Sequence, residues 1–413
     1  MITGKYPAPK QSSRPGEKTT KKPLKHLSIV DNWIRYEQRK EAGNEVQTCE
    51  FPIYTDVGVS GECTQGPYRF LNPVAPRGYP GSIKAAVILR YTDLLEFERP
   101  DLGAKKTDSS RYHGGALQDE VAALMSLLLG ARFTVGALSR IFGPNHDPLG
   151  RPVAWHDVTL PQIIFANDRP VVPGALGTRN LSGLAPMHQL VSLTPEQCVA
   201  LIRSARLYQD ALWLCEREPA LSWLMLVSAL EGAASCWRQD SDPPLERLRM
   251  SKPEFVAELE ALDVEGLPDR VATEFADSLG VTKKFVDFCL EHLPPAPTVR
   301  PSPAFQVDWT ADSWKKKLQI IYRLRSKALH EGTPFPFSMC QAPDHVSGDK
   351  APSERGTSGL AVHGLGGRWE AKDLPTNLNT FMGFTRDALL KWLQGMLEAS
   401  APSAAAEKPQ TKI

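Results

Sequence analysis

The sequence predicts a mainly α-helical protein, in which a C-terminal helical bundle is preceded by an N-terminal domain of mixed α+β character. Over residues 194–398, apolar residues recur at intervals of three and four, the spacing that places side chains on one face of a helix. Over residues 28–190, turn residues are frequent, and short apolar runs such as residues 85–90 are typical of strands. The chain is long enough for two domains, each with its own core.

Composition divides the chain into four expected segments. Residues 1–27 are rich in Lys, Pro and Ser and are predicted to be a disordered basic arm. The N-terminal domain of uncertain fold covers residues 28–190, and the helical domain covers residues 191–398. Inside the helical domain, residues 333–378 form a long loop rich in Gly, Pro and Ser, and loops of that length are usually functional lids or disordered. Residues 399–413 are predicted to be a disordered tail.

The N-terminal domain contains one helical segment between two strand-like runs. It covers residues 115–142, begins with acidic residues that suit the helix dipole, and is expected to break at Gly136. Residues 160–166 are the second, weaker strand candidate. Four basic residues flank this region and are expected at the surface, with a shared polar pocket as the alternative: Arg111, His113, Arg132 and Arg140.

Capping signals mark the start of several helices in the C-terminal domain. Thr194 with Gln197 forms a capping box, and Pro195 stands at the first helical position. Ser251 with Glu254 predicts a second capping box, before a helix to about residue 262. Asn379 or Thr380 is expected to cap the last helix.

The helix over residues 220–237 is apolar almost all round, which places it at the centre of the bundle. Glu231 is the exception, and a carboxylate in such a helix is costly unless it is paired or hydrogen-bonded. One interpretation is a bond to a core Arg, Tyr or backbone group. The other is that Glu231 supports a functional site by orienting Arg325 or His330.

Charge and cysteine content limit the function classes. The formal net charge is +1, so any contact with RNA must come from a local basic patch. The seven cysteines form no C-x-x-C pair and are odd in number, which predicts reduced thiols and a cytoplasmic protein. The start of the chain lacks the apolar core of a signal peptide, and the most apolar run, residues 121–130, is too short to span a bilayer. No membrane partner, metal or cofactor is expected.

The candidate site lies in residues 314–336, WKKKLQIIYRLRSKALHEGTPFP, which predict one amphipathic helix. Leu318, Ile321 and Leu324 share its buried face, and Gly332 followed by Pro334 ends it. Thr310 or Asp312 is the expected N-cap.

A cation, a hydroxyl and an imidazole stand close together near the end of this helix: Arg325, Ser326 and His330. At 100° per residue, Ser326 lies about 40° from His330, whereas Arg325 lies about 140° away. Arg323 lies about 20° from His330 by the same arithmetic. Helix geometry alone therefore favours Arg323 as the neighbour of His330.

Three runs of sequence resemble the HEPN superfamily, most closely its Apea-like branch: YRLRSKALHEG (residues 322–332), LVSALEGAASCW (226–237) and FTRDALLKWL (384–393). The resemblance implies an all-helical, dimeric domain and, for many members, metal-independent endoribonuclease activity. It assigns the catalytic pair to Arg325 and His330, completed across a dimer. Ser326 stands where the ribonuclease branches commonly carry Asn, Asp or His, and Glu331 separates His330 from the following Gly.

From this resemblance we expect a metal-independent endoribonuclease, with RNA and a second copy of the chain as partners. The catalytic residues would be Arg325 and His330, with Ser326, Glu231 and Arg323 in support. A toxin or antiviral-defence effector, whose N-terminal domain senses a trigger, is the biological role that the resemblance implies. The alternative is a catalytically inactive HEPN-like module that binds RNA or another protein.

Overall fold

The computed structural model describes most of the chain: residues 27–40, 47–74, 81–95, 107–143, 148–153, 162–166, 169–238, 243–275, 280–345 and 347–400. The predicted basic arm, residues 1–27, lies outside this part except for its last residue. Of the predicted tail, residues 399–413, only the first two residues are described, and they belong to the last helix.

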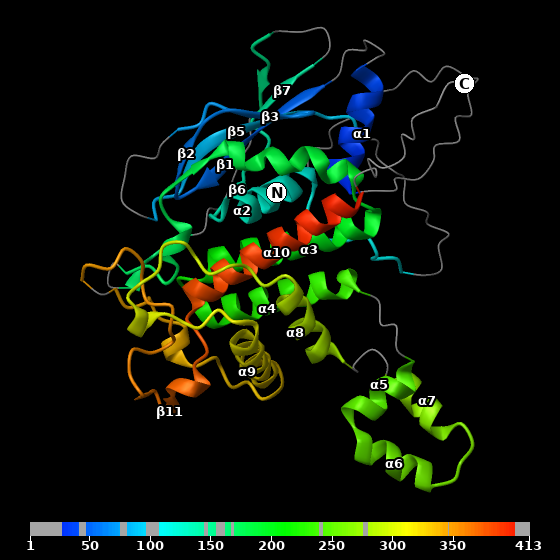
Figure 1. The fold of residues 1–413 in the computed structure, drawn as a ribbon. Helices are drawn as coiled ribbons and strands as arrows, with labels where there is room; N and C mark the ends of the chain where they lie inside the picture. The colour runs from blue at the N-terminus through cyan, green and yellow to red at the C-terminus, as the bar shows by residue number, and fades with distance from the viewer. Residues whose placement is uncertain are drawn as a thin grey trace, which may run out of the picture.

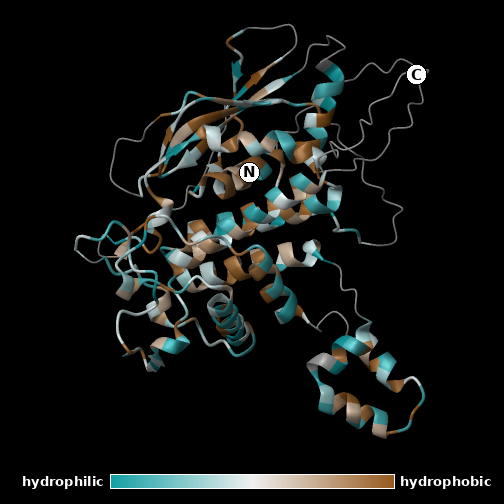
Figure 2. Ribbon diagram, viewed as in Figure 1, coloured by the Kyte–Doolittle hydropathy of each residue, from teal (hydrophilic) through white to brown (hydrophobic). Residues whose placement is uncertain are grey.

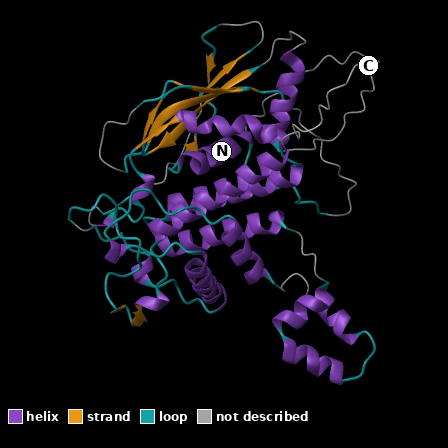
Figure 3. Cartoon of the chain, viewed as in Figure 1, coloured by secondary structure: helices purple, strands orange, loops and turns teal. Residues whose placement is uncertain are grey.

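A twisted antiparallel sheet forms one side of the molecule (Figure 1, Figure 3). Its strands follow the order β3-β4-β5-β1-β7-β8, and β6 also pairs with β1. The strand predicted at residues 85–90 is confirmed as β5, and its long pairing with β1 forms the middle of the sheet. The strands are β1 (Thr48–Thr55), β3 (Cys63–Gln65), β4 (Tyr68–Leu71), β5 (Lys84–Thr92), β6 (Thr134–Val135), β7 (Arg140–Phe142) and β8 (Arg151–Pro152).

Two further strand pairs lie outside this sheet. The short strand β2 (Gly58–Ser60) pairs in parallel with β9 (Thr178–Asn180), which ties two distant parts of the chain together. A hairpin joins β10 (Ala361–Gly364) to β11 (Gly367–Glu370). The strand predicted over residues 160–166 is wrong for its described part, because residues 162–165 are in no strand.

Helices pack in layers beneath the sheet. Figure 1 shows α2 next to the sheet, followed by α3 and α10, then α4, with α8 and α9 on the far side. The α-helices of the main body are α1 (Ser28–Lys40), α2 (Leu117–Leu129), α3 (Pro195–Leu214), α4 (Pro219–Trp237), α8 (Val281–Glu291), α9 (Ala311–His330) and α10 (Leu378–Ser400). The 3-10 helices are η2 (Pro173–Ala175), η3 (Leu181–Ser192), η4 (Pro303–Phe305), η5 (Phe337–Met339) and η6 (Ala371–Asp373). The structure therefore shows a mixed α+β protein.

One hydrophobic core extends through the sheet and the helices. Its buried members run from Leu27 to Met396, so the core is continuous across the predicted boundary near residue 190. As expected, α4 lies at its centre, with Trp223 and Leu230 fully buried (Figure 2). By length and composition alone, α4 would be apolar enough to cross a membrane, a test that the core helix of a soluble protein also passes.

A second, smaller core belongs to three short helices that stand apart from the main body in Figure 1. These helices are α5 (Pro244–Ser251), α6 (Pro253–Ala261) and α7 (Leu267–Glu274). Their shared core consists of Leu248, Val256, Leu259 and Ala272. We call these three helices the satellite.

Several predicted helix limits are corrected by the structure. The helix expected over residues 115–142 ends at Leu129, because Gly130 adopts the left-handed conformation that closes a helix. Helix α6 has Lys252 as its N-cap, so the capping box predicted from Ser251 and Glu254 is wrong. The capping box of Thr194 and Gln197 is confirmed.

The segment predicted as a long loop, residues 333–378, contains regular structure and is partly packed on the core, although residues 357–373 are exposed or half-exposed. It contains η5, the β10–β11 hairpin and η6, and it contributes Phe335 and Met339 to the core. At its end, the side chain of Asn377 accepts a hydrogen bond from the backbone N–H of Thr380 at 3.0 Å. Asn377, and not Asn379 or Thr380, therefore provides the capping side chain of α10.

Candidate functional site

Helix α9 carries most of the predicted site residues. The Thr310 side chain accepts a hydrogen bond from the backbone N–H of Ser313, which confirms one of the two expected N-caps. Trp314, Leu318 and Ile321 are fully buried and anchor the helix to the core. Gly332 follows the helix with a φ of +68°, as a glycine stop requires. The packed side fixes which residues of α9 face the solvent.

The exposed side of α9 is basic. Lys315, Lys316, Arg323, Lys327 and His330 are all exposed, and we call these five residues the α9 basic face. Lys316, Arg323, Lys327 and His330 follow one another at intervals of seven, four and three residues, which keeps them along one side of the helix, and Lys315 lies at the edge of that side. The helix has a single acidic residue, in its first turn, so this face carries a strong positive charge although the whole chain is nearly neutral.

A hydrogen-bonded cluster lies beside this face, between α9 and α4. Glu231 accepts a hydrogen bond from the Tyr322 hydroxyl at 2.9 Å and from Nη2 of Arg325 at 2.8 Å. The side chains of Arg325 and Glu231 are only 21% and 15% exposed, so water screens this ion pair weakly. We call Glu231, Tyr322 and Arg325 the Glu231 cluster.

Two features of the cluster bear on its chemistry. Burial, together with the neighbouring carboxylate of Glu231, raises the pKa of Tyr322 to about 12, so the hydroxyl remains a hydrogen-bond donor. The Nε of Arg325 is buried and has no hydrogen-bond partner among the described residues. A buried N–H without an acceptor is costly, and here it belongs to a group that binds phosphate well.

The structure brings two of the predicted residues together and separates others. Glu231 contacts Arg325, a partner that both interpretations of this carboxylate allowed. Ser326 is half-buried, whereas Arg323 and His330 are exposed. Among the described residues of one chain, no hydrogen bond or ion pair joins Arg325 to His330, so one chain alone does not assemble this pair.

Sequence reasoning missed Tyr322 as a member of the cluster. It lies three residues before Arg325, on the side of α9 that faces α8, and its ring packs against Phe285 with centroids 5.2 Å apart. Tyr322 could have been found because a buried tyrosine hydroxyl usually needs a hydrogen-bond partner, and α4 carries a single carboxylate.

Three of the four basic residues that flank α2 have carboxylate partners of their own rather than a shared pocket. Arg132 and His113 were expected at the surface, and for both that prediction is wrong. The Arg132 side chain is fully buried and pairs with Asp56 and Glu216. The His113 side chain is 7% exposed, and its Nε2 lies 2.8 Å from the buried carboxylate of Glu120.

The other two basic residues of this group keep solvent-accessible positions: Arg140 is partly exposed beside Glu50, and Arg111 is exposed. Within the described part of the chain, no group of three or more His, Cys, Asp or Glu residues is placed to hold a metal ion.

Comparison with known proteins adds no relative: no family model, no curated protein and no solved structure matches the chain. The assignment of Arg325 and His330 as a pair thus depends on the sequence motifs, and the Glu231 cluster and the α9 basic face depend on the geometry.

Proposed function

We propose that the chain binds RNA along the α9 basic face and cleaves it without a metal ion, at a site that two copies build from Arg325 and His330. The basic face supports this proposal most, because a row of exposed cations on one helix suits the phosphate backbone of a nucleic acid. His330 belongs to that row, at the end of the helix. The fold proposed for residues 191–398 is the HEPN-like helical domain that the motifs predict.

The proposed reaction needs a base, an acid and a positive charge. The 2′-oxygen attacks the neighbouring phosphorus while one His330 accepts the 2′-hydroxyl proton, and the second His330 donates a proton to the departing 5′-oxygen. The bond from phosphorus to the 5′-oxygen breaks, which leaves a 2′,3′-cyclic phosphate and a 5′-hydroxyl. Arg325 would stabilise the phosphorane through N–H groups that Glu231 does not occupy.

The second candidate function is RNA or protein binding without cleavage, and one observation favours it. The charge of Arg325 is already paired with Glu231 at 2.8 Å, so a phosphate must share or displace this carboxylate before Arg325 can stabilise a transition state. A toxin or antiviral-defence role, with the N-terminal region sensing a trigger, is part of the proposal only through the resemblance.

The test is cleavage of RNA in the presence of EDTA by the purified full-length chain. We expect wild-type protein to release fragments with cyclic-phosphate ends, and we expect His330→Ala to abolish cleavage while it still binds RNA. Arg325→Ala should also fail, and Arg325→Lys should keep part of the activity. The matched control is His345→Ala, which removes an exposed histidine outside α9.

Two results would redirect the proposal. If Arg323→Ala reduces cleavage more than Arg325→Ala does, helix geometry identifies the correct arginine and the motif assignment is wrong. If the wild-type chain binds RNA but does not cleave it under any of these conditions, the inactive binding module is the better description. Sedimentation of the same samples would show whether two copies associate, as the shared site requires.

A further inference from the structure

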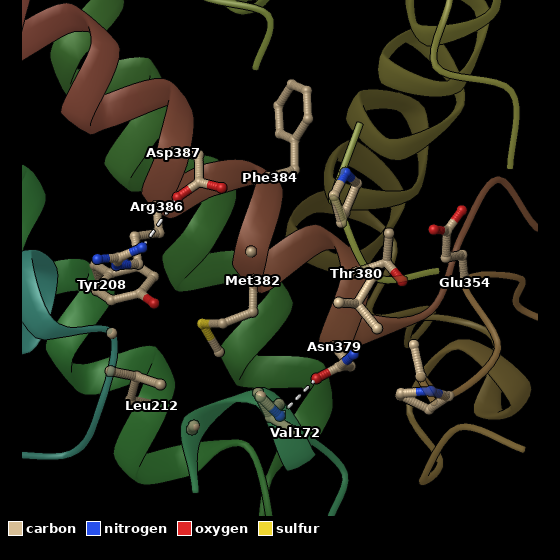
Figure 4. A pocket seen from close by; sticks show the side chains of 18 of the residues that line it. Val172, Tyr208, Leu212, Glu354, Asn379, Thr380, Met382, Phe384, Arg386 and Asp387 are labelled. Atoms are coloured by element: carbon tan, nitrogen blue, oxygen red, sulfur yellow. Dashed lines mark hydrogen bonds and ion pairs between the residues drawn. The ribbon is translucent and has the colours of Figure 1, made fainter. Parts of the chain in front are cut away.

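A cleft of about 380 Å³, lined by no residue of the α9 basic face, lies across the first turns of α10 (Figure 4). Its walls come from segments far apart in sequence: the end of α2, the residues around η2, helix α3, and residues 297–301 together with 351–354. A volume of this size is typical of a small-molecule site.

One end of the cleft is polar. Figure 4 shows Tyr208, Arg386 and Asp387 together at this end, with Met382 and Leu212 beside them. Tyr208 is 2% exposed as a whole and lines the cleft. A tyrosine hydroxyl can both donate and accept a hydrogen bond, so this group can bond to a ligand in the cleft.

Arg386 and Asp387 present a donor beside an acceptor. Nη1 of Arg386 donates to the Asp387 carboxylate at 3.1 Å, while its Nε and Nη2 donate to the carbonyl oxygens of Leu127 and Leu128 at the end of α2. The Asp387 side chain is about half exposed, so its second carboxylate oxygen is open to a ligand.

The charges at this end favour a neutral ligand. Arg179 also lines the cleft, but all its N–H groups donate to backbone carbonyls, among them those of Leu129 and Gly130. It therefore has no donor left for an anion, and Asp387 repels one. A cation is disfavoured by the two guanidinium groups of Arg179 and Arg386.

The middle of the cleft is apolar, and Glu354, Asn379 and Thr380 line its other end (Figure 4). Val172, Leu212 and Met382 contribute aliphatic surface, and Pro297 and Pro301 hold the opposite wall with little conformational freedom. Its floor includes Gly383, where an added Cβ would meet nothing within 4 Å.

We propose that this cleft binds a nucleobase-type ligand, a neutral flat heteroaromatic ring whose edge carries a hydrogen-bond acceptor next to a donor. The donor of the ring would face Asp387, its acceptor would face Arg386, and the Tyr208 hydroxyl would form a third hydrogen bond. This inference does not depend on RNA cleavage, because the cleft contains none of the residues of the α9 basic face or of the Glu231 cluster.

The experiment is calorimetric titration of the full-length chain with adenosine, guanosine, cytidine and uridine. The variant Gly383→Trp fills the floor of the cleft, and Gly395→Trp is its matched control on the same helix, at a glycine that also has open space around it. We expect wild type and Gly395→Trp to bind at least one nucleoside saturably, and Gly383→Trp to lose at least about tenfold in affinity. Circular dichroism would confirm that both variants fold.

Two further variants test the polar end. Tyr208→Phe removes only the hydroxyl and should weaken binding by roughly threefold to tenfold. Asp387→Asn exchanges one acceptor for a donor and should change the order of preference among the four nucleosides. The proposal is overturned if none of the four binds, or if Gly383→Trp binds as wild type does. It is equally overturned if indole, an apolar ring without this edge, binds as tightly and Asp387→Asn has no effect.

Discussion

Arg132, in the connection between α2 and β6, and Arg325, on α9, are both ion-paired arginines, but their surroundings differ. Arg132 is fully buried and donates hydrogen bonds to Asp56, Glu216 and the Leu212 carbonyl at 2.8 to 2.9 Å. Arg325 is 21% exposed, donates through Nη2 to Glu231, and has a buried Nε without a partner among the described residues.

This difference gives Arg132 a structural role, whereas Arg325 keeps N–H groups that can bind a ligand. Arg132 joins the end of β1 to the end of α3, so it connects the sheet to the helices. Burial alone would lower the pKa of Arg132, but Cys215, Asp56 and Glu216 raise it, so the side chain stays charged. An arginine with unused N–H groups beside a basic surface can still bind an anion.

The largest expected effect follows from breaking the buried pair. Arg132→Met should lower the free energy of unfolding by about 3–5 kcal/mol, because it leaves two buried carboxylates without their cation. Urea denaturation would measure it. The control is Arg140→Met, whose ion pair with Glu50 is partly exposed and should cost about 1 kcal/mol or less. Equal losses in the two variants would remove the distinction between a buried and an exposed arginine here.

His292 is a buried ionisable residue whose Nε2 has no hydrogen-bond partner among the described residues. Unlike the two arginines, it should make the stability of the fold depend on pH. His292 packs against Trp237 and Phe288, and burial lowers its pKa to about 4, with Lys391 and Arg238 acting in the same direction and Glu291 opposing them. The unfolded chain therefore binds the proton more readily. Stability should be fully present above about pH 6.5 and fall by at most about 1.4 kcal/mol per pH unit down to about pH 4.

Melting temperatures measured from pH 7 to pH 4 test this expectation, with His292→Phe as the comparison. The variant should lose less stability than wild type over that interval, because other acid-sensitive groups remain in both proteins. Parallel curves for the two proteins would show that His292 is accessible to protons in the folded chain.

How far the sequence predicts these features depends on how local they are. The caps at Thr194 and Thr310 involve neighbouring residues; the first was predicted correctly, and the second was one of the two residues that the sequence offered. The burial of Arg132 depends on Asp56, 76 residues away, and on carboxylates whose positions only the packed sheet and helices fix. Surface placement is the usual outcome for an arginine, so nothing nearby in sequence signals the exception.

The Glu231 cluster is intermediate between the local helix caps and the long-range burial of Arg132. Glu231→Ala should cost about 1–2 kcal/mol in unfolding free energy, because the Tyr322 hydroxyl and one N–H group of Arg325 lose their acceptor. Glu231→Gln keeps one acceptor oxygen and should cost less. Thermal melting compares both with Glu258→Ala, an exposed carboxylate on the satellite. If Glu231→Gln abolishes RNA cleavage with little change in stability, Glu231 orients the site.

Glu231 could be predicted as an anomaly, whereas the cleft across α10 could not. A single carboxylate in the apolar run of α4 signals a partner, and the motif helix supplies two. The cleft is formed by segments between residues 129 and 387, and its polar end combines α3 with α10. Only the packing of these helices shows that Tyr208 and Asp387 share one site.

The smallest expected stability change belongs to Arg325. Replacing it with Met should cost less than about 1 kcal/mol, because the Arg325 guanidinium makes one charged hydrogen bond and water can reach the Glu231 carboxylate once it is gone. The same change should weaken RNA binding and reduce the slope of log affinity against log salt by about 1, as expected for one lost phosphate contact. Arg132→Met should leave that slope unchanged for the molecules that remain folded. If Arg325→Met instead destabilises the chain as much as Arg132→Met does, Arg325 is a structural residue, and the proposed cleavage site loses the charge that was to stabilise its transition state.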